Sequence, residues 1–211
     1  QGNIDLMPLP IARQLPALRL VQLLSAGSNE LDIRGLAELG ISVANNGGAN
    51  AIPVSEHAIA LMLSVYRCMM QQWQTARAGN WADGIDYASF TEIAGKTVGI
   101  VGFGNIGRQV ARRLSGFGCT LIYYDIVELS AGREDELGAR SCASLEELLS
   151  QSDIVTLHVP LSPSTRKLIG ASELAMMQRH AVLINTCRGP VVDEPALIVA
   201  LKRGVIAGAG L

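Results

Sequence analysis

Short apolar runs alternate with longer segments of helical spacing along most of the chain. The apolar runs predict strands at residues 18–24, 41–44, 98–101, 121–124, 153–157, 181–185 and 205–211. Apolar positions that recur every three or four residues predict helices at 30–39, 54–73, 106–117, 144–150, 172–178 and 193–203. Strands that alternate with helices are typical of a parallel sheet covered on both faces. The pattern therefore predicts an α/β protein with a doubly wound parallel sheet.

The longest helical pattern begins at Pro53, which suits a helix start, and its apolar face continues through Met69 and Trp73. We expect this face to be ordinary core, and we expect a bend or break near Cys68. A domain boundary is placed at the same point. Residues 1–68 would then form a smaller α/β domain, and residues 69–211 a dinucleotide-binding domain.

A glycine turn, GFGNIG, joins a predicted strand to a predicted helix. Gly102 allows the tight turn, Gly104 lets a diphosphate approach the backbone, and Gly107 lets the helix pack close to the sheet. The free N–H groups of Asn105 and Ile106 at the helix start can hold the diphosphate. Strand, turn and helix together predict dinucleotide binding.

The strand after this helix ends in an acid, Asp125, 18 residues after Gly107. A carboxylate at that position accepts the ribose hydroxyls of NAD and repels a 2′-phosphate. The predicted cofactor is therefore NAD.

Polar residues follow four of the predicted strands of the larger domain: the glycine turn, Asp125, His158 and Arg188. In a doubly wound sheet, ligands bind outside the carboxyl ends of the strands, so these residues predict one site. Arg188 is the catalytic candidate, because its guanidinium can grip a carboxylate through two parallel bonds and polarise a carbonyl oxygen. The alternative is an arginine that pairs with a core acid or caps a helix.

Composition excludes several classes. The chain has 211 residues, of which 49% are hydrophobic and 17% charged, and its net charge of -2 includes no basic block that would favour nucleic acid. Its apolar runs are too short to cross a membrane. Four scattered cysteines and three distant histidines show no metal-ligand spacing, so we expect free thiols, no metal and a reducing cytoplasm.

Three further stretches, LHVPLSPST, LINTCRG and AGAGL, resemble the D-isomer-specific 2-hydroxyacid dehydrogenases, as do VGFGNIGRQVA and GANAIPVSEHAIALML. The resemblance covers nearly the whole chain. It implies a Rossmann domain, a smaller flavodoxin-like substrate domain, a cleft between them and a homodimer. It also implies hydride transfer between NAD and a short 2-hydroxy or 2-oxo acid, such as glyoxylate or hydroxypyruvate.

The resemblance assigns roles to individual residues. Arg188 would bind the substrate carboxylate and C2 oxygen, and Ala26, Gly27 and Asn50 would complete the carboxylate site. The cofactor would contact Gly102, Gly104, Asn105, Ile106, Gly107, Asp125, His158, Pro160, Thr186 and Cys187. Phosphite is a disfavoured substrate, because phosphite-oxidising relatives carry a lysine at the position of the small Ala26.

Both ends of the chain look cut, so we expect a partial substrate domain and a C-terminally truncated dinucleotide domain. By the resemblance, the family's Glu and His for proton transfer lie beyond the AGAGL strand, so the 211 residues alone should bind NAD weakly or not at all and turn over little. Two other interpretations stay open: an NAD(H)-sensing corepressor that binds peptides, and a methyltransferase that uses S-adenosylmethionine.

Overall fold

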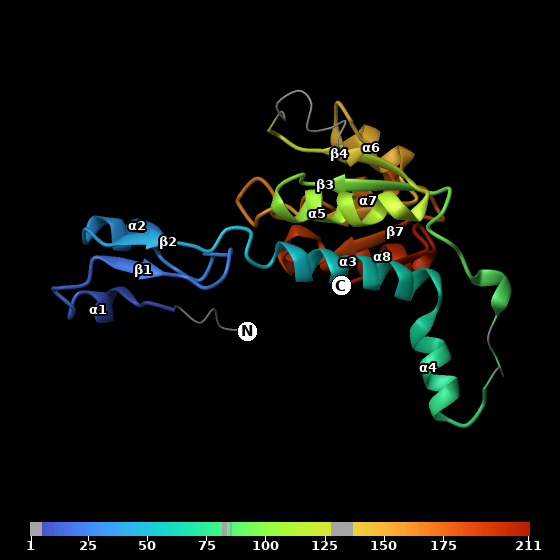
Figure 1. Ribbon diagram of the computed structural model, residues 1–211, viewed down its shortest axis with the longest axis horizontal. Helices are drawn as coiled ribbons and strands as arrows, with labels where there is room; N and C mark the ends of the chain where they lie inside the picture. The colour runs from blue at the N-terminus through green and yellow to red at the C-terminus, as the bar shows by residue number, and fades with distance from the viewer. Residues whose placement is uncertain (1–5, 82–83, 85, 128–136) are drawn as a thin grey trace. The chain divides into compact units, whose positions relative to one another are not determined.

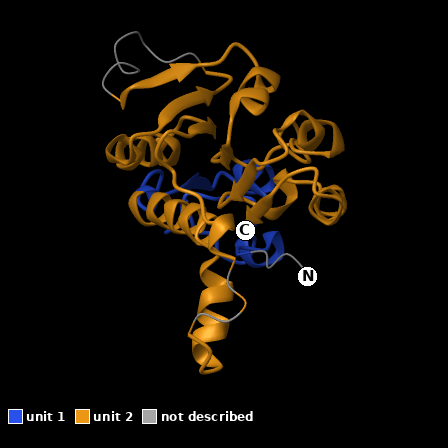
Figure 2. Cartoon of the chain, turned by 90° about the vertical axis from the view of Figure 1, so that its right-hand side faces the viewer, with its two compact units in different colours: residues 1–51 blue, residues 52–211 orange. Residues whose placement is uncertain are grey.

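The computed structural model describes residues 6–81, 84, 86–127 and 137–211. The chain forms two compact units, residues 1–51 and 52–211, shown in blue and orange in Figure 2. The sequence had placed the boundary near Cys68. The units divide earlier because helix α3 (Ala51–Tyr66) contributes Ala58, Met62 and Tyr66 to the core of the larger unit.

The smaller unit is built around two parallel strands, β1 (Leu20–Gln22) and β2 (Ser42–Ala44). Its helices are α1 (Leu9–Ala12) and α2 (Ile33–Glu38). Ala12, Leu36 and Ile41 form its small core. The smaller unit is thus a parallel βαβ arrangement.

The expectation of a long buried strand at residues 18–24 is wrong. Only three of its residues pair in the sheet, and the flanking Leu24 is 90% exposed. An apolar run has the same sequence pattern whether or not another element packs on the strand, so the pattern alone does not predict burial.

The larger unit contains one six-stranded parallel sheet in the order β5-β4-β3-β6-β7-β8. Its strands are β3 (Thr97–Val101), β4 (Thr120–Tyr124), β5 (Ala139–Ser141), β6 (Ile154–Leu157), β7 (Val182–Asn185) and β8 (Gly208–Gly210). All five pairings are parallel. Numbered from the first strand of this unit, the order is 3-2-1-4-5-6, which defines a doubly wound dinucleotide-binding sheet.

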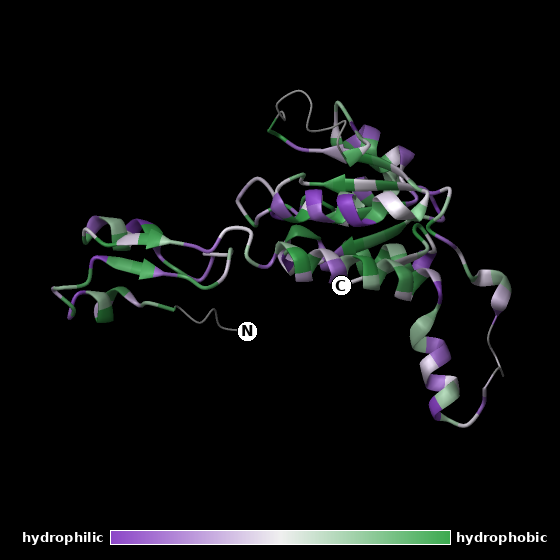
Figure 3. Ribbon diagram, in the orientation of Figure 1, coloured by the Kyte–Doolittle hydropathy of each residue, from purple (hydrophilic) through white to green (hydrophobic). Residues whose placement is uncertain are grey.

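Helices cover both faces of this sheet, as Figure 1 shows. They are α5 (Asn105–Leu114), α6 (Leu145–Gln151), α7 (Ala171–Met176) and α8 (Glu194–Arg203), together with α3. Helices α3 and α5 share one core with alternate residues of the strands, and α6, α7 and α8 share the other. The central strands β3, β6 and β7 are correspondingly apolar for most of their length in Figure 3, as expected for a parallel sheet buried on both faces.

Helix α4 (Met69–Arg77) leaves the layered body, because the left-handed backbone of Cys68 (φ 49°) ends the direction of α3. The expected break is therefore confirmed, but the expected burial of the whole apolar face is wrong. Met69 and Trp73 are 51% and 54% exposed. Once the chain turns at Cys68, helical spacing no longer carries these side chains onto the sheet.

Three details differ from the sequence prediction. Strand β5 was missed because it is short and polar, and part of the polar stretch before it, residues 128–136, lies outside the described residues. The last strand is shorter than predicted. A 3-10 turn, Tyr87–Ser89, lies in the connection before β3, and two others, Ser115–Phe117 and Gly189–Val191, follow α5 and precede α8. No helix in the described part of the chain could span a membrane.

Candidate cofactor and substrate site

The strand order of the larger unit reverses between β3 and β6, which lie side by side. Gly102 directly follows β3, and His158 directly follows β6. Their backbones touch, since a Cβ on Gly102 would lie 2.8 Å from the carbonyl group of His158. A ligand crevice is expected at such a reversal, outside the carboxyl ends of the strands.

The three glycines of the turn have different surroundings. Gly102 has a φ of +90°, and Gly107 packs so close to it that a Cβ on Gly107 would collide with the Gly102 carbonyl oxygen. A Cβ on Gly104 would meet no atom within 4 Å. Gly102 and Gly107 therefore serve the fold, whereas Gly104 faces open space at the start of α5. There the N–H groups of Asn105 and Ile106 lack partners within the helix.

Asp125 follows β4 and lies against the glycine turn. Its Oδ2 accepts a hydrogen bond of 2.7 Å from the Phe103 N–H, and its Oδ1 accepts one of 3.0 Å from the Val127 N–H. The structure thus brings together the two features that the sequence assigned to the diphosphate and the ribose.

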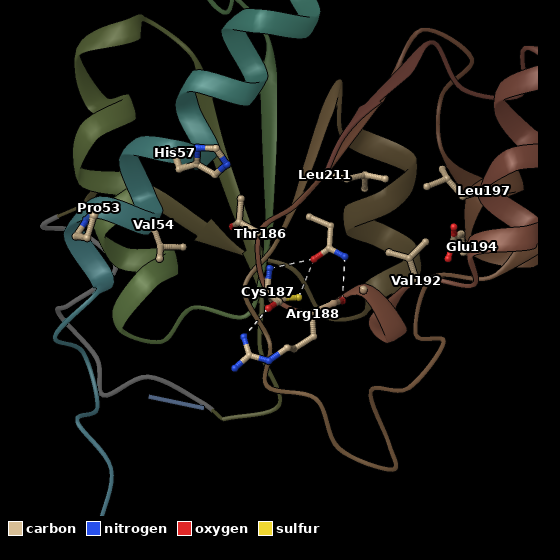
Figure 4. A pocket seen from close by; sticks show the side chains of 12 residues that line it. Pro53, Val54, His57, Thr186, Cys187, Arg188, Val192, Glu194, Leu197 and Leu211 are labelled. Carbon is tan, nitrogen blue, oxygen red and sulfur yellow. Dashed lines mark hydrogen bonds between the residues drawn. The ribbon is translucent and has the colours of Figure 1, made fainter. Parts of the chain in front are cut away.

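Arg188 follows β7 on the same edge of the sheet, and its exposed side chain is drawn in Figure 4. Its Nη1 donates a hydrogen bond of 2.8 Å to the Cys187 carbonyl oxygen. Because β7 pairs with β6, which pairs with β3, Arg188 and the glycine turn lie at the same carboxyl-end edge of the sheet, separated by a single strand.

Asn185, the last residue of β7, was not predicted and organises the Arg188 loop. Its Oδ1 accepts a hydrogen bond from the Cys187 N–H, and its Nδ2 donates one to the Arg188 carbonyl oxygen, both at 3.0 Å. The side chain is buried. A polar residue that ends an otherwise apolar strand was the available signal.

A cavity of about 540 Å³ lies beside this loop within the larger unit. Helix α3, the end of β7 and helix α8 supply its walls. The lining residues are Pro53, Val54, His57, Asn185, Thr186, Cys187, Arg188, Gly189, Val192, Glu194, Leu197 and Leu211. Figure 4 shows His57 on α3 across from Thr186 and Arg188. The contribution of α3 was not foreseen, because its residues are far from Arg188 in sequence.

His158 lies at the end of β6, where its Nε2 is 2.9 Å from the Thr156 Oγ1. Burial lowers the pKa of His158 to about 4. Its Nδ1 and the Thr186 Oγ1 are buried polar atoms without a hydrogen-bond partner. Two such atoms at adjacent strand ends, next to the reversal of strand order, are what a polar ligand would satisfy.

The depressed pKa makes His158 a source of pH-dependent stability. An unfolded histidine takes up a proton near pH 6.5, so between pH 6.5 and 4 the unfolded chain binds more protons than the folded one. We expect His158 to reduce the free energy of unfolding by about 2 kcal/mol between pH 7.5 and 5. Urea titrations at both pH values should show a smaller loss in His158→Gln. The exposed His57→Gln should keep the full loss, and equal losses in all three proteins would contradict the assignment.

The loop after His158 carries Pro160 and is closed by Thr165. The Thr165 Oγ1 donates to the Pro160 carbonyl oxygen at 2.6 Å and accepts from the Ser162 N–H at 2.8 Å. Pro160 is exposed at this edge of the sheet. The loop is therefore held by its own side chains, a feature that no sequence motif predicted.

The three predicted substrate contacts lie in the smaller unit. Ala26 and Gly27 follow β1, and Asn50 belongs to the loop that follows β2. The two loops are tied together by a hydrogen bond of 2.8 Å from the Asn45 Nδ2 to the Ala26 carbonyl oxygen. Parallel pairing of β1 and β2 thus gathers these loops at one edge of the small sheet.

The described residues offer neither a cluster of metal ligands nor a disulfide. Within the described residues, no group of three or more His, Cys, Asp or Glu side chains could hold a metal ion. All four cysteines are free. Burial raises the pKa of the Cys187 thiol, which disfavours the nucleophilic thiolate.

The residues at the sheet edge fit a dinucleotide. Gly104 leaves open space over the start of α5, an acid ends the neighbouring strand, and two orphaned polar atoms lie beyond the reversal point. The fold and this edge define a dinucleotide-binding protein of the doubly wound class.

Residues 59–211 match the family described as D-isomer specific 2-hydroxyacid dehydrogenase, NAD binding domain. The chain therefore belongs to that family. It is 38% identical over 204 residues to a glycerate dehydrogenase of Methylorubrum extorquens, covering 94% of this chain and 61% of the relative. It is 41% identical over 201 residues to a glyoxylate reductase of Korarchaeum cryptofilum, covering 93% and 59%.

A solved structure, a glyoxylate reductase from Paecilomyes thermophila, is similar with a TM-score of 0.87 and 37% identity, covering 93% of this chain and 58% of that one. The chain thus spans about 60% of the length of the relatives that it matches.

Proposed function

We propose that the protein is an NAD-dependent oxidoreductase that transfers a hydride between NAD(H) and a small D-2-hydroxy acid or the corresponding 2-oxo acid. One observation supports this most directly. The glycine turn after β3 and Arg188 after β7 lie at the same edge of the sheet, beside the reversal of strand order. A cofactor held at the first and an acid held at the second would meet there.

Arg188 would bind the acid. Its guanidinium presents a rigid fork of N–H donors that matches a carboxylate through two parallel bonds. The same cation stabilises negative charge that develops on the C2 oxygen as a 2-oxo acid is reduced. Asn185 holds the backbone from which this side chain extends.

The cofactor, when bound, supplies the hydride chemistry. The chain supplies its binding surface: the helix N–H groups of Asn105 and Ile106 for the diphosphate and Asp125 for the ribose. His158, Pro160, Thr186 and Cys187 would line the side of the crevice formed by β6 and β7. His158 is unsuited to exchange protons with the substrate near neutral pH, because its pKa is about 4.

The other predicted substrate contacts, Ala26, Gly27 and Asn50, would add backbone and amide donors from the smaller unit. Short 2-oxo acids, among them glyoxylate and hydroxypyruvate, are the proposed substrates. The named relatives act in that range: a glycerate dehydrogenase and glyoxylate reductases.

The test is NADH oxidation by the full-length protein with glyoxylate, hydroxypyruvate and pyruvate, and the reverse reaction with D- and L-glycerate. We expect turnover of at least one 2-oxo acid and a preference for the D-isomer in reverse. Absence of turnover with every acid, in protein that binds NADH, would contradict the proposal.

Asp125 should decide between NAD and NADP. Its carboxylate accepts ribose hydroxyls and repels a 2′-phosphate, so Asp125→Ala should raise KM for NAD and relax discrimination against NADP by about tenfold or more. The measurement is kcat/KM with both cofactors. An unchanged ratio would show that the ribose is bound elsewhere.

A homodimer in the cytoplasm completes the proposal. Helix α4 presents Met69, Met70 and Trp73 to solvent, an exposed apolar surface suited to a second copy of the chain. The free cysteines suit a reducing compartment. Sedimentation of the wild type beside a variant with glutamates at Met70 and Trp73 tests the first part, and a dimer that persists in the variant would place the interface elsewhere.

A further inference from the structure

The carboxylate of Asp125 accepts hydrogen bonds from two backbone N–H groups of the chain itself. Its Oδ2 accepts the Phe103 N–H at 2.7 Å, a short distance typical of a charge-assisted bond, and its Oδ1 accepts the Val127 N–H at 3.0 Å. Phe103 is the residue between Gly102 and Gly104. Asp125 therefore holds the middle of the turn that should carry the diphosphate.

Two further contacts attach the same turn to the end of β4. The Gly102 N–H donates to the Tyr124 carbonyl oxygen at 2.9 Å, and the Phe103 ring stacks on Tyr123 with centroids 4.1 Å apart. The ring contact anchors the side chain of Phe103. The carboxylate of Asp125 fixes the direction of its peptide N–H.

The direction of the Gly102–Phe103 peptide matters because it leads into Gly104, which opens onto free space and directly precedes α5. Rotation of this peptide plane, which the bond to Asp125 holds, would turn the helix-start N–H groups away from a diphosphate. A carboxylate offers about four acceptor positions, and the described residues use two of them. The others could accept the ribose hydroxyls.

We propose that Asp125 is a positioning residue for the diphosphate-binding turn in addition to its role as the ribose acceptor. This inference rests on the proposed function, since it assumes that a dinucleotide binds at the turn. It makes a prediction that the ribose role alone does not make: Asp125 should aid the binding of a ligand that has a diphosphate and no ribose hydroxyls.

The sign of the effect separates the two roles. For a ligand without ribose hydroxyls, a carboxylate that acts only on the ribose would repel the phosphates, and its removal would leave affinity unchanged or increase it. If Asp125 positions the turn, its removal lowers that affinity. The probe is 2′,3′-dideoxyadenosine diphosphate, compared with NAD by calorimetry on the full-length protein.

We expect Asp125→Ala to weaken binding of the dideoxy diphosphate by about tenfold, since a hydrogen bond to a charged group is lost from the turn. Asp125→Asn keeps one acceptor oxygen for the Phe103 N–H and should lose less. Asp86→Ala is the matched control, because Asp86 also accepts a backbone N–H, from Ala88 at 3.0 Å. It should bind both ligands like the wild type.

Exchange of the Phe103 amide hydrogen in the ligand-free protein gives a second measurement, and it should accelerate in Asp125→Ala. If Asp125→Ala binds NAD less tightly and the dideoxy diphosphate as well as before, the positioning role is wrong and the proposed function stands. If the wild type binds neither ligand, the proposed function is wrong and the inference is lost with it.

Discussion

Replacing Arg188 with methionine should lower kcat/KM for a 2-oxo acid by about a thousandfold, with little change in the affinity for NADH. The loss combines a charge-assisted grip on the carboxylate with stabilisation of charge on the C2 oxygen. The measurements are steady-state kinetics of the full-length protein and a fluorescence titration with NADH. The variant should fold normally, because the Arg188 side chain is exposed and bonds only to the neighbouring carbonyl among the interactions of the described residues.

Two controls sharpen this result. Arg188→Lys keeps the charge and loses the fork, so it should recover only part of the activity. Arg179→Met removes an exposed arginine just before β7, at the opposite edge of the sheet, and should leave kinetics unchanged. Similar rates for Arg188→Met and the wild type would rule out Arg188 as the acid-binding group.

Alanine substitutions at Gly107 and Gly104 of the same turn should affect different properties, stability in the first case and NAD binding in the second. Gly107→Ala should destabilise the protein by about 3 kcal/mol, because its Cβ would collide with the backbone carbonyl of Gly102. Gly104→Ala should leave the free energy of unfolding nearly unchanged and weaken NAD binding by about tenfold or more. Its Cβ meets no protein atom but fills the space into which a diphosphate would enter.

Urea unfolding and NAD titration of both variants check this pair. Gly116→Ala is the control, since a Cβ there also meets nothing within 4 Å and lies at the far end of α5. It should change neither property. A Gly104→Ala protein that binds NAD as tightly as the wild type would place the diphosphate elsewhere.

Local pattern was sufficient for most of the larger unit. The apolar runs at β3, β4, β6 and β7 and the helical spacing of α5 and α8 matched the observed elements, because both faces of this sheet are covered. The helix predicted at residues 193–203 is observed as α8, Glu194–Arg203. The hydrophobic pattern gave wrong predictions in two places. At residues 18–24 the run is apolar but largely exposed, and at β5 the strand is short and polar.

The candidate site was predictable in its strand-end residues and not in its supports. The glycine turn, Asp125 and Arg188 were predictable, because each follows a predicted strand and has a residue type that suits a diphosphate, a ribose or a carboxylate. Asn185 and the α3 wall of the cavity act through contacts with residues far away or through backbone bonds, and no periodicity reveals such contacts.

By itself, then, the amino-acid sequence determined the parallel α/β class, the turn that suits a dinucleotide and the acid that suits NAD. These depend on the period of side chains and on the conformational freedom of glycine, which are local properties. Only the tertiary structure decided that α3 belongs to the larger unit, that Met69 and Trp73 face solvent, and that β3 and β6 are neighbours. The physical reason is that strand pairing and helix packing join segments that are far apart in the sequence. The arrangement that forms is the one that buries apolar side chains and satisfies backbone hydrogen bonds at the same time, and local sequence does not specify it.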